Sequence, residues 1–404
     1  MSSRLRSLLV RFSNRTRTGP PGDNPAARVV ALLTMPYPRP EPCPRRRAPD
    51  RGASRLNPGN PHVAANSSLT ADHPGFRSVL PGYTAPSTRE DALGTVVAAA
   101  VETAERFRAL VVSGALELPL PGHGATGARW AALSALGAEN LTVARLAEGH
   151  TDAAAILAEL AGVTTQPGTL WGVWAAAPGT LRAERAGSGW RLTGSRKWCS
   201  GAYTCTDALV TAVGPDGPAL FHARVGAGVE PVPDTWLATG MAASDSGTVE
   251  FTDAPAEPVG RPGDYTARPG FWHGGMGVAA VWLGGARGVA RELDRLAEPD
   301  AHQFAHIGAV DALLATGQAV LDEAARQVDA GPGEPAEQLA LRVRAAVERV
   351  ATEVLDRVGR ATGAGPLSLT AEHGTRVADL QVYLRQSHAE RDLARLGELA
   401  AAQW

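Results

Sequence analysis

The sequence predicts an α+β protein in which an N-terminal helical domain is followed by a central antiparallel β-barrel and a C-terminal four-helix bundle. Three observations predict this order. Apolar residues recur at helical spacing up to residue 166, short strand-like runs between glycine and proline turns fill residues 167–262, and long helical patterns occupy residues 263–404. A chain of 404 residues is long enough for two or three packed units.

Residues 1–75 differ in composition from the rest of the chain. The first 55 residues contain twelve arginines and three acidic residues, and prolines cluster between positions 36 and 44. Proline at this density removes backbone donors and prevents helix formation. We therefore expect a disordered extension rich in proline and arginine. The alternative is a transit-like segment, because residues 1–17 are rich in serine and arginine and contain no acidic residue.

The N-terminal helical domain is expected at residues 76–166. A helix is predicted over residues 87–112, behind a capping box formed by Ser87 and Glu90. A loop rich in glycine and proline at residues 118–127 leads to a second helical stretch, in which apolar residues recur at helical spacing up to residue 160.

The β-barrel and the helical bundle are expected at residues 167–262 and 263–404. Short β-type runs bounded by turn residues predict strands at residues 170–177, 180–186, 190–193, 208–213, 219–225 and 248–252. The later helical patterns predict helices at residues 275–297, 303–329, 335–362 and 370–402.

The composition argues against several classes of protein. A formal net charge of -2 gives no reason to expect a nucleic-acid partner or a basic membrane-surface protein. The three cysteines are widely spread and form no CxxC pair, which indicates a reducing cytoplasm and neither a disulfide framework nor a metal site. The uninterrupted apolar runs are shorter than a membrane span requires. We therefore expect a soluble, cytoplasmic protein.

The most structured motif occupies residues 194–202. It contains the single lysine of the chain, Lys197, for which we expect a structural role. A glycine turn leads into a strand that carries Trp198, and Cys199 and Ser200 follow. This pattern is expected of a strand that presents an aromatic ring and a hydroxyl group to a flat ligand.

This motif and three further stretches resemble one protein family. The order of helices, barrel and bundle resembles that of the acyl-CoA dehydrogenase family of flavoproteins. The stretches that resemble the family in sequence are residues 140–150, 192–202, 239–241 with 248–253, and 283–288. The likeness covers about residues 80–404. It implies a homo-oligomer that binds FAD, acts on an acyl-CoA-like substrate and passes electrons to an electron-transfer flavoprotein.

By this resemblance, Trp198, Cys199 and Ser200 bind the isoalloxazine ring of FAD. The indole packs against the ring, and a hydroxyl and a backbone N–H hydrogen-bond its N5–O4 edge. The alternative for Trp198 is a place in the barrel core. Trp174, in what resembles the first barrel strand, is either a flavin neighbour or a core residue. The family's Thr-Glu-Pro and Gly-Ser-Asp loop is replaced here by residues 176–178 and a short turn.

The catalytic base of the family has no counterpart in this chain. Family members remove an α-proton with a glutamate, and the matching position is occupied by Ser387, while a second known position falls near Val278. His388 is the candidate base, since helical spacing from Leu384 directs Ser387 or His388 toward the bundle and an imidazole titrates near neutrality. The alternative is a histidine that only supports helix packing. His273 is a weaker candidate.

A further departure concerns the phosphates of the cofactor. The family's Arg-x-x-Phe-Gly sequence is replaced by His-Gln-Phe-Ala-His at residues 302–306.

Three hypotheses about function follow from the pattern as a whole. The leading hypothesis is an FAD-dependent α,β-desaturation of an acyl thioester. The others are a flavin monooxygenase on the same scaffold and a catalytically degenerate subunit that pairs with an active homologue.

Overall fold

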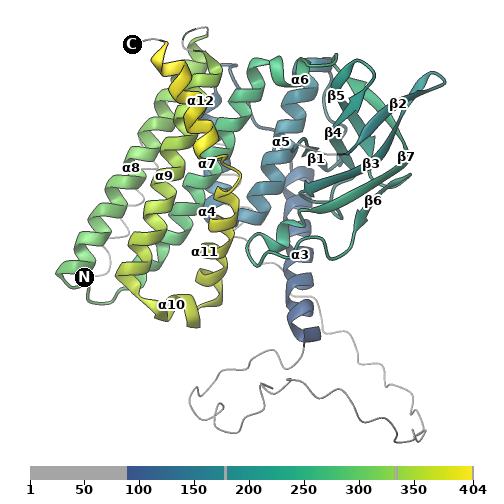
Figure 1. The fold of residues 1–404 in the computed structure, drawn as a ribbon. Coiled ribbons are helices and arrows are strands. Elements are labelled where there is room, and N and C mark those ends of the chain that lie inside the picture. The colour runs from purple at the N-terminus through teal and green to yellow at the C-terminus, as the bar shows by residue number, and fades with distance from the viewer. Residues whose placement is uncertain (1–88, 177–179, 332, 334, 403–404) are drawn as a thin grey trace, which may run out of the picture. The chain divides into compact units, whose positions relative to one another are not determined.

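Figure 1 shows the computed structural model, which describes residues 89–176, 180–331, 333 and 335–402. The extension expected at residues 1–75 lies outside the described residues, as does Ser87 of the predicted capping box. All contacts reported below lie within the compact unit that includes residues 96–404.

Three helices precede the sheet: α3 (Arg89–Val112), α4 (Thr126–Glu139) and α5 (Leu141–Ala161). The second predicted helical stretch is therefore two helices, which Asn140 separates. Asn140 has an extended backbone, and its Oδ1 accepts a hydrogen bond of 2.9 Å from the N–H of Val143, so that it caps α5. Gly162, in the left-handed region, ends α5.

The sheet closes on itself to form a five-stranded barrel with two additional strands. The ladder runs β4–β2–β3–β7–β5 and returns to β4, while β1 pairs with β4 and β6 pairs with β7. The strands are β1 (Trp171–Trp174), β2 (Arg182–Ala186), β3 (Gly189–Cys199), β4 (Asp207–Gly214), β5 (Gly217–Arg224), β6 (Val229–Val232) and β7 (Gly247–Val259).

Two of the strand pairings, β1–β4 and β2–β4, are parallel. The expectation of an antiparallel barrel is therefore wrong for the pairings along this side of β4. β1 pairs with the start of β4, with Trp171 opposite Asp207, and β2 pairs with the end of β4. A parallel pair needs a crossover, which the β2–β3 hairpin supplies between β1 and β4. Strand β6 was not predicted, because its four residues include a proline, Pro231.

The helices after the barrel are α6 (Asp264–Ala267), α7 (Pro269–Ala290), α8 (Ala301–Ala330), α9 (Ala336–Thr362), α10 (Ala364–Leu369), α11 (Ala371–Leu384) and α12 (Glu390–Ala401). The predicted helices at residues 275–297, 303–329 and 335–362 correspond to α7, α8 and α9. The single helix predicted at residues 370–402 is wrong. α11 ends at Leu384, and Ala389 has a φ of 47°, which an α-helix cannot contain.

The helices before and after the barrel share one apolar core. Leu133 of α4, Trp282 of α7 and Val354 of α9 all belong to it. α4 and α7 pack backbone against backbone, since a Cβ on Gly284 would lie 2.0 Å from the carbonyl oxygen of Ser134. No side chain fits at that distance, so the close packing requires glycine.

Helix α8 is the one described helix that is long and apolar enough to cross a membrane by length and composition. It packs on α9, α7 and α4 through residues that include Val310, Gly317 and Leu321. Only 17% of its most apolar window is buried within the chain. The expectation of no membrane association stays a prediction.

A loop of the barrel domain is fixed on α11 by a steric and a polar contact. A Cβ on Gly240 would lie 2.1 Å from the carbonyl oxygen of Ala378. The next residue, Met241, donates its N–H to Oδ1 of Asp379 at 2.5 Å. Asp379 is buried, and burial raises its pKa to about 6, although the hydrogen bond from Met241 opposes the change.

The raised pKa of Asp379 predicts a pH-dependent contribution to stability. Between about pH 4 and pH 6 the folded protein retains this proton more firmly than the unfolded chain, so the contribution falls as the pH rises. We expect the Asp379→Asn variant, which keeps an acceptor for Met241, to match the wild type at about pH 4. At pH 7 its free energy of unfolding should be higher by about 2–3 kcal/mol. Urea unfolding at both pH values checks this, and identical pH profiles would contradict it.

Candidate active site at the junction of barrel and helices

The end of β3 turns the side chain of Trp198 out of the barrel. The register between β3 and β7 shifts between Arg196 and Cys199, and Trp198 has a φ of 61°. Arg196 and Cys199 are buried, whereas 56% of Trp198 is exposed. The indole of Trp198 therefore lies on the surface of the barrel. The alternative, a place for Trp198 in the barrel core, is wrong.

Cys199 faces the interior of the barrel. Its Sγ lies 3.3 Å from the carbonyl oxygen of Arg196, and burial raises the pKa of the thiol. Cys205 is also buried, and burial raises its pKa to about 12. Both thiols are free and protonated at neutral pH. Cys199 can contribute only its backbone to a ligand that lies against Trp198.

The hydroxyl of Ser200 belongs to a chain of serines whose direction is fixed. Ser244 Oγ donates to the carbonyl oxygen of Met241 at 2.7 Å, and Ser246 Oγ lies 2.8 Å from Ser244 Oγ and 2.8 Å from Ser200 Oγ. Since Ser244 gives its proton to Met241, Ser246 must donate to Ser244, and Ser200 must donate to Ser246. The proton of Ser200 is therefore engaged by Ser246 and is not available to a ligand.

Trp174 supports Ser200 from inside the barrel. It is 1% exposed, and its Nε1 donates to the carbonyl oxygen of Ser200 at 3.0 Å. Of the two alternatives for this residue, the structure places it in the core.

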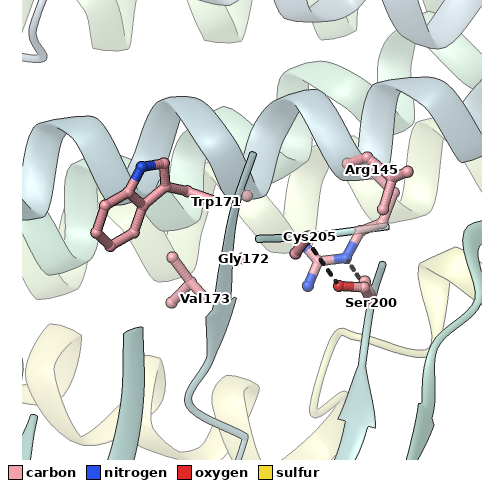
Figure 2. A pocket seen from close by; sticks show the side chains of 8 residues that line it. Arg145, Trp171, Gly172, Val173, Ser200 and Cys205 are labelled. Carbon is pink, nitrogen blue, oxygen red and sulfur yellow. Dashed lines mark hydrogen bonds between the residues drawn. The ribbon is translucent and has the colours of Figure 1, made fainter. Parts of the chain in front are cut away.

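Arg145 on α5 reaches the same serine from the helical side. Its Nε donates to Ser200 Oγ at 3.1 Å (Figure 2). Its Nη1 forms an ion pair with Glu148. Burial is the largest single influence on Arg145 and acts against its charge, but Glu148, Tyr383 and Asp152 together outweigh it, and the pKa of Arg145 is raised. Burial also raises the pKa of Glu148, although Arg145 opposes this. We treat the pair as ionised at neutral pH, because a guanidinium keeps its proton and Glu148 accepts its hydrogen bond.

The side chain of Tyr383, on α11, completes this cluster. It is 5% exposed, and its hydroxyl has no hydrogen-bond partner of good geometry among the described residues. Burial and then the charge of Glu148 raise its pKa, so the phenol stays protonated. A cavity of about 10 Å³, enough for one water molecule, lies beside Arg145 and Ser200 between α5 and β1 (Figure 2).

Sequence reasoning missed Arg145 and Glu148. Both lie in the stretch at residues 140–150 that supported the family resemblance. The available signal was a pair of opposite charges at spacing i, i+3 on a helix whose neighbouring residues are almost all apolar.

The candidate residues Ser387 and His388 lie in the break between α11 and α12. His388 is 58% exposed, and its Nδ1 lies 3.2 Å from Oδ1 of Asp392. Ser387 Oγ accepts the N–H of Ala389. Leu384 is buried as predicted, but α11 ends at this residue. Helical spacing therefore does not direct Ser387 or His388 toward the bundle, and that prediction is wrong. Within the described part of the chain, neither is hydrogen-bonded to Arg145 or Ser200.

The backbone of this break is held by Arg344 of α9. Its guanidinium donates to the carbonyl oxygen of Gly275 at 2.8 Å and to that of Gln386 at 3.2 Å, and it lies 4.6 Å from the ring centre of Trp282. Val278, at the second position of a family base, is 4% exposed within the apolar core. Neither position provides a carboxylate.

A second and larger cavity, of about 650 Å³, lies at the other end of α5. Its lining residues come from α5, from the loop before α4 and from the ends of α7, α8 and α9. His273 is among them. No group of three metal-ligating side chains occurs within the described residues.

The buried pair predicts a specific pattern of stability changes. Arg145→Met leaves the carboxylate of Glu148 buried without a cation and should lower the free energy of unfolding by about 3–5 kcal/mol. Adding Glu148→Gln should recover more than half of the loss. The exposed pair Arg326–Glu323 serves as a control, because the same changes there should have little effect on stability. Chemical denaturation of each single and double variant at the two pairs measures this, and additive losses at Arg145 and Glu148 would contradict it.

Comparisons with known proteins identify the architecture. The sequence matches no protein-family model and no curated protein. Among solved structures, TdsC from Paenibacillus sp. A11-2, with FMN and indole, is 19% identical over 77% of this chain and 98% of its own, with a TM-score of 0.60.

Two further structures are similar to the same extent. KijD3, in complex with FMN and a dTDP-linked amino sugar, is 18% identical over 79% of this chain and 95% of its own, with a TM-score of 0.63. A steroid acyl-CoA dehydrogenase variant, Tcur3481-Tcur3483, is 22% identical over 78% of this chain and 99% of its own, with a TM-score of 0.59. With its closed barrel between two sets of helices, the chain has the acyl-CoA dehydrogenase fold.

Proposed function

We propose that this protein is a flavin-dependent oxidoreductase whose flavin ring lies against Trp198 beside Ser200. One observation carries the proposal: a positive φ holds the indole of Trp198 outside the barrel, two residues from a serine that is hydrogen-bonded to the half-buried Arg145. An exposed aromatic plate next to polar groups fits a flat, polarisable ring. The printed descriptions of TdsC and KijD3, which include FMN, support the same cofactor class.

The residues of this chain define what the bound ring would meet. A flavin supplies hydride acceptance or, once reduced, oxygen transfer from dioxygen. Ser200 donates to Ser246 and accepts from Arg145, so its remaining lone pair can accept a hydrogen bond but its proton cannot be donated outward. Such an acceptor favours a ring N–H, which the flavin carries at N5 when reduced. Arg145 places a positive charge beside the same edge and stabilises negative charge there.

FMN is sufficient for this proposal, although the sequence resemblance implied FAD. The segment at residues 302–306 contains no lysine or arginine for a diphosphate. Its Gln303 closes the capping box of α8 with Asp300 and donates to the carbonyl oxygen of Ala361. The start of α8 is therefore committed to helix capping and packing.

For the reaction, we propose oxygen transfer to a substrate. Desaturation of an acyl thioester needs a positioned base, and Ser387 and His388 lie in a partly exposed loop where His388 pairs with Asp392. The buried carboxylate linked to Ser200 through Arg145 is Glu148, which Arg145 engages. Desaturation stays the second candidate because the raised pKa of Glu148 suits a proton acceptor.

The partners follow as proposals. A monooxygenase receives electrons from a separate reductase or from reduced flavin, and a dehydrogenase passes them to an electron-transfer flavoprotein. The long apolar helix α8, which is largely uncovered within the chain, supports a homo-oligomer.

The place of the flavin is tested by removing the indole. We expect Trp198→Ala to raise the dissociation constant for FMN about tenfold, because the aromatic contact is lost, and to leave the free energy of unfolding nearly unchanged. Leu369→Ala, at an exposed residue of α10, is the control. Fluorescence titration of FMN measures both. If the wild type does not bind FMN or FAD at all, the proposed function fails.

The reaction class is tested under nitrogen. We expect the flavin absorbance of the loaded protein to stay unchanged with octanoyl-CoA, because the candidate bases Glu148 and His388 are engaged by Arg145 and Asp392. Bleaching of the flavin by octanoyl-CoA that Glu148→Gln slows by at least about tenfold would establish desaturation with Glu148 as the base.

A further inference from the structure

The cavity of about 650 Å³ at the carboxyl end of α5 has the size of a small-molecule site. It lies on the same helix as Arg145, with Ala155, Ala158 and Glu159 on its wall. The other walls are the loop before α4, the start of α7, the end of α8 and the start of α9. Most of the lining is apolar and includes Leu120, Pro121, Pro269, Val328 and Leu339.

The positive charge in this lining is already neutralised. Arg268 is the one arginine or lysine among the described lining residues, and its side chain is 3% exposed. It pairs with Glu159 at 2.7 Å and lies 3.8 Å from Asp152. Two carboxylates thus face one guanidinium.

The two helix starts at the cavity are also unsuited to an anion. The N–H of Gly270, in the first turn of α7, donates to Oε1 of Glu159, so a carboxylate already occupies that helix terminus. The first turn of α9 carries Glu337, which pairs with Arg395. Asp329, at the end of α8, adds a further negative charge nearby and accepts hydrogen bonds from the loop before α4.

Besides Glu159 and Arg268, the polar lining side chains are His123, Gln327 and His273. His123 and Gln327 each already make a hydrogen bond, to Pro121 and to Glu323, so His273 is the side chain most available for a ligand. Burial lowers the pKa of His273, so its imidazole is neutral at physiological pH. Neither ring nitrogen has a hydrogen-bond partner among the described residues. A neutral imidazole can donate one hydrogen bond and accept another.

We infer that this cavity binds a neutral, largely apolar small molecule with one hydroxyl or similar hydrogen-bonding group, and that it does not accept a coenzyme A thioester. The phosphates of coenzyme A require arginine, lysine or a free helix terminus, and the cavity offers none of these from its described residues. The chemical class of the bound molecule follows from the cavity alone, because the cavity lies at the other end of α5 from Ser200 and the proposed flavin.

Binding of 2-naphthol to the full-length protein, measured by equilibrium dialysis with and without FMN, tests the inference. Ala158→Trp fills the cavity and should raise the dissociation constant at least about tenfold. His273→Leu removes one hydrogen bond with little change of volume and should raise it about fivefold. Ala131→Trp, at an exposed position of α4, should leave it unchanged.

Octanoyl-CoA should not displace 2-naphthol from the wild type. Displacement by octanoyl-CoA, or equal binding by the wild type, Ala158→Trp and His273→Leu, would overturn the inference. Thermal unfolding of each variant identifies a loss of fold, and His273→Leu decides the result if Ala158→Trp does not fold. If 2-naphthol binds as expected but no flavin does, the proposed function fails and the inference on the cavity stands.

Discussion

The junction between barrel and helices depends on a cation that is largely, but not wholly, removed from water: the side chain of Arg145 is 15% exposed. Arg145 joins α5 to the loop after β3, through Ser200, and neutralises Glu148 one helical turn away. Moving two charges out of water costs several kcal/mol, which is offset only when both retain strong partners. Any displacement of the loop relative to α5 would weaken these contacts. The position of Ser200 is therefore set by electrostatics as well as by packing.

A second constraint is steric and acts from the opposite side. The barrel loop that contains Gly240 lies directly on the backbone of α11, and Gly284 of α7 lies on the backbone of α4. These contacts leave no room for side chains and therefore little freedom to slide. α11 carries both Asp379, which holds the loop, and Tyr383, which interacts with Arg145, so the contact that fixes the loop also fixes Tyr383. Two distances around the polar cluster therefore depend on glycine: that between the barrel loop and α11, and that between α7 and α4.

The fold was predictable because its signals are local and repeated. Alternating and helical periodicities placed almost every strand and most helices, and the motif around Trp198 marked the edge of the barrel. The break at residues 385–389 was not predictable, because a positive φ at Ala389 leaves no trace in periodicity. Arg145 was missed for a different reason: its role comes from Ser200, which is 55 residues away in sequence and adjacent only in the folded chain.

The chain of serines gives the site a polarity that is controlled from a distance. The carbonyl oxygen of Met241 takes the last proton, and this choice sets the orientation of every hydroxyl back to Ser200. A change at Ser244, which is fully buried, would free Ser246 to reverse its proton and turn Ser200 from an acceptor into a donor. For the proposed flavin at Trp198, a residue that the ligand does not touch would therefore decide whether Ser200 favours the oxidised or the reduced ring. A comparison of homologous sequences that considers only the residues around Trp198 and Ser200 would not detect a change at Ser244.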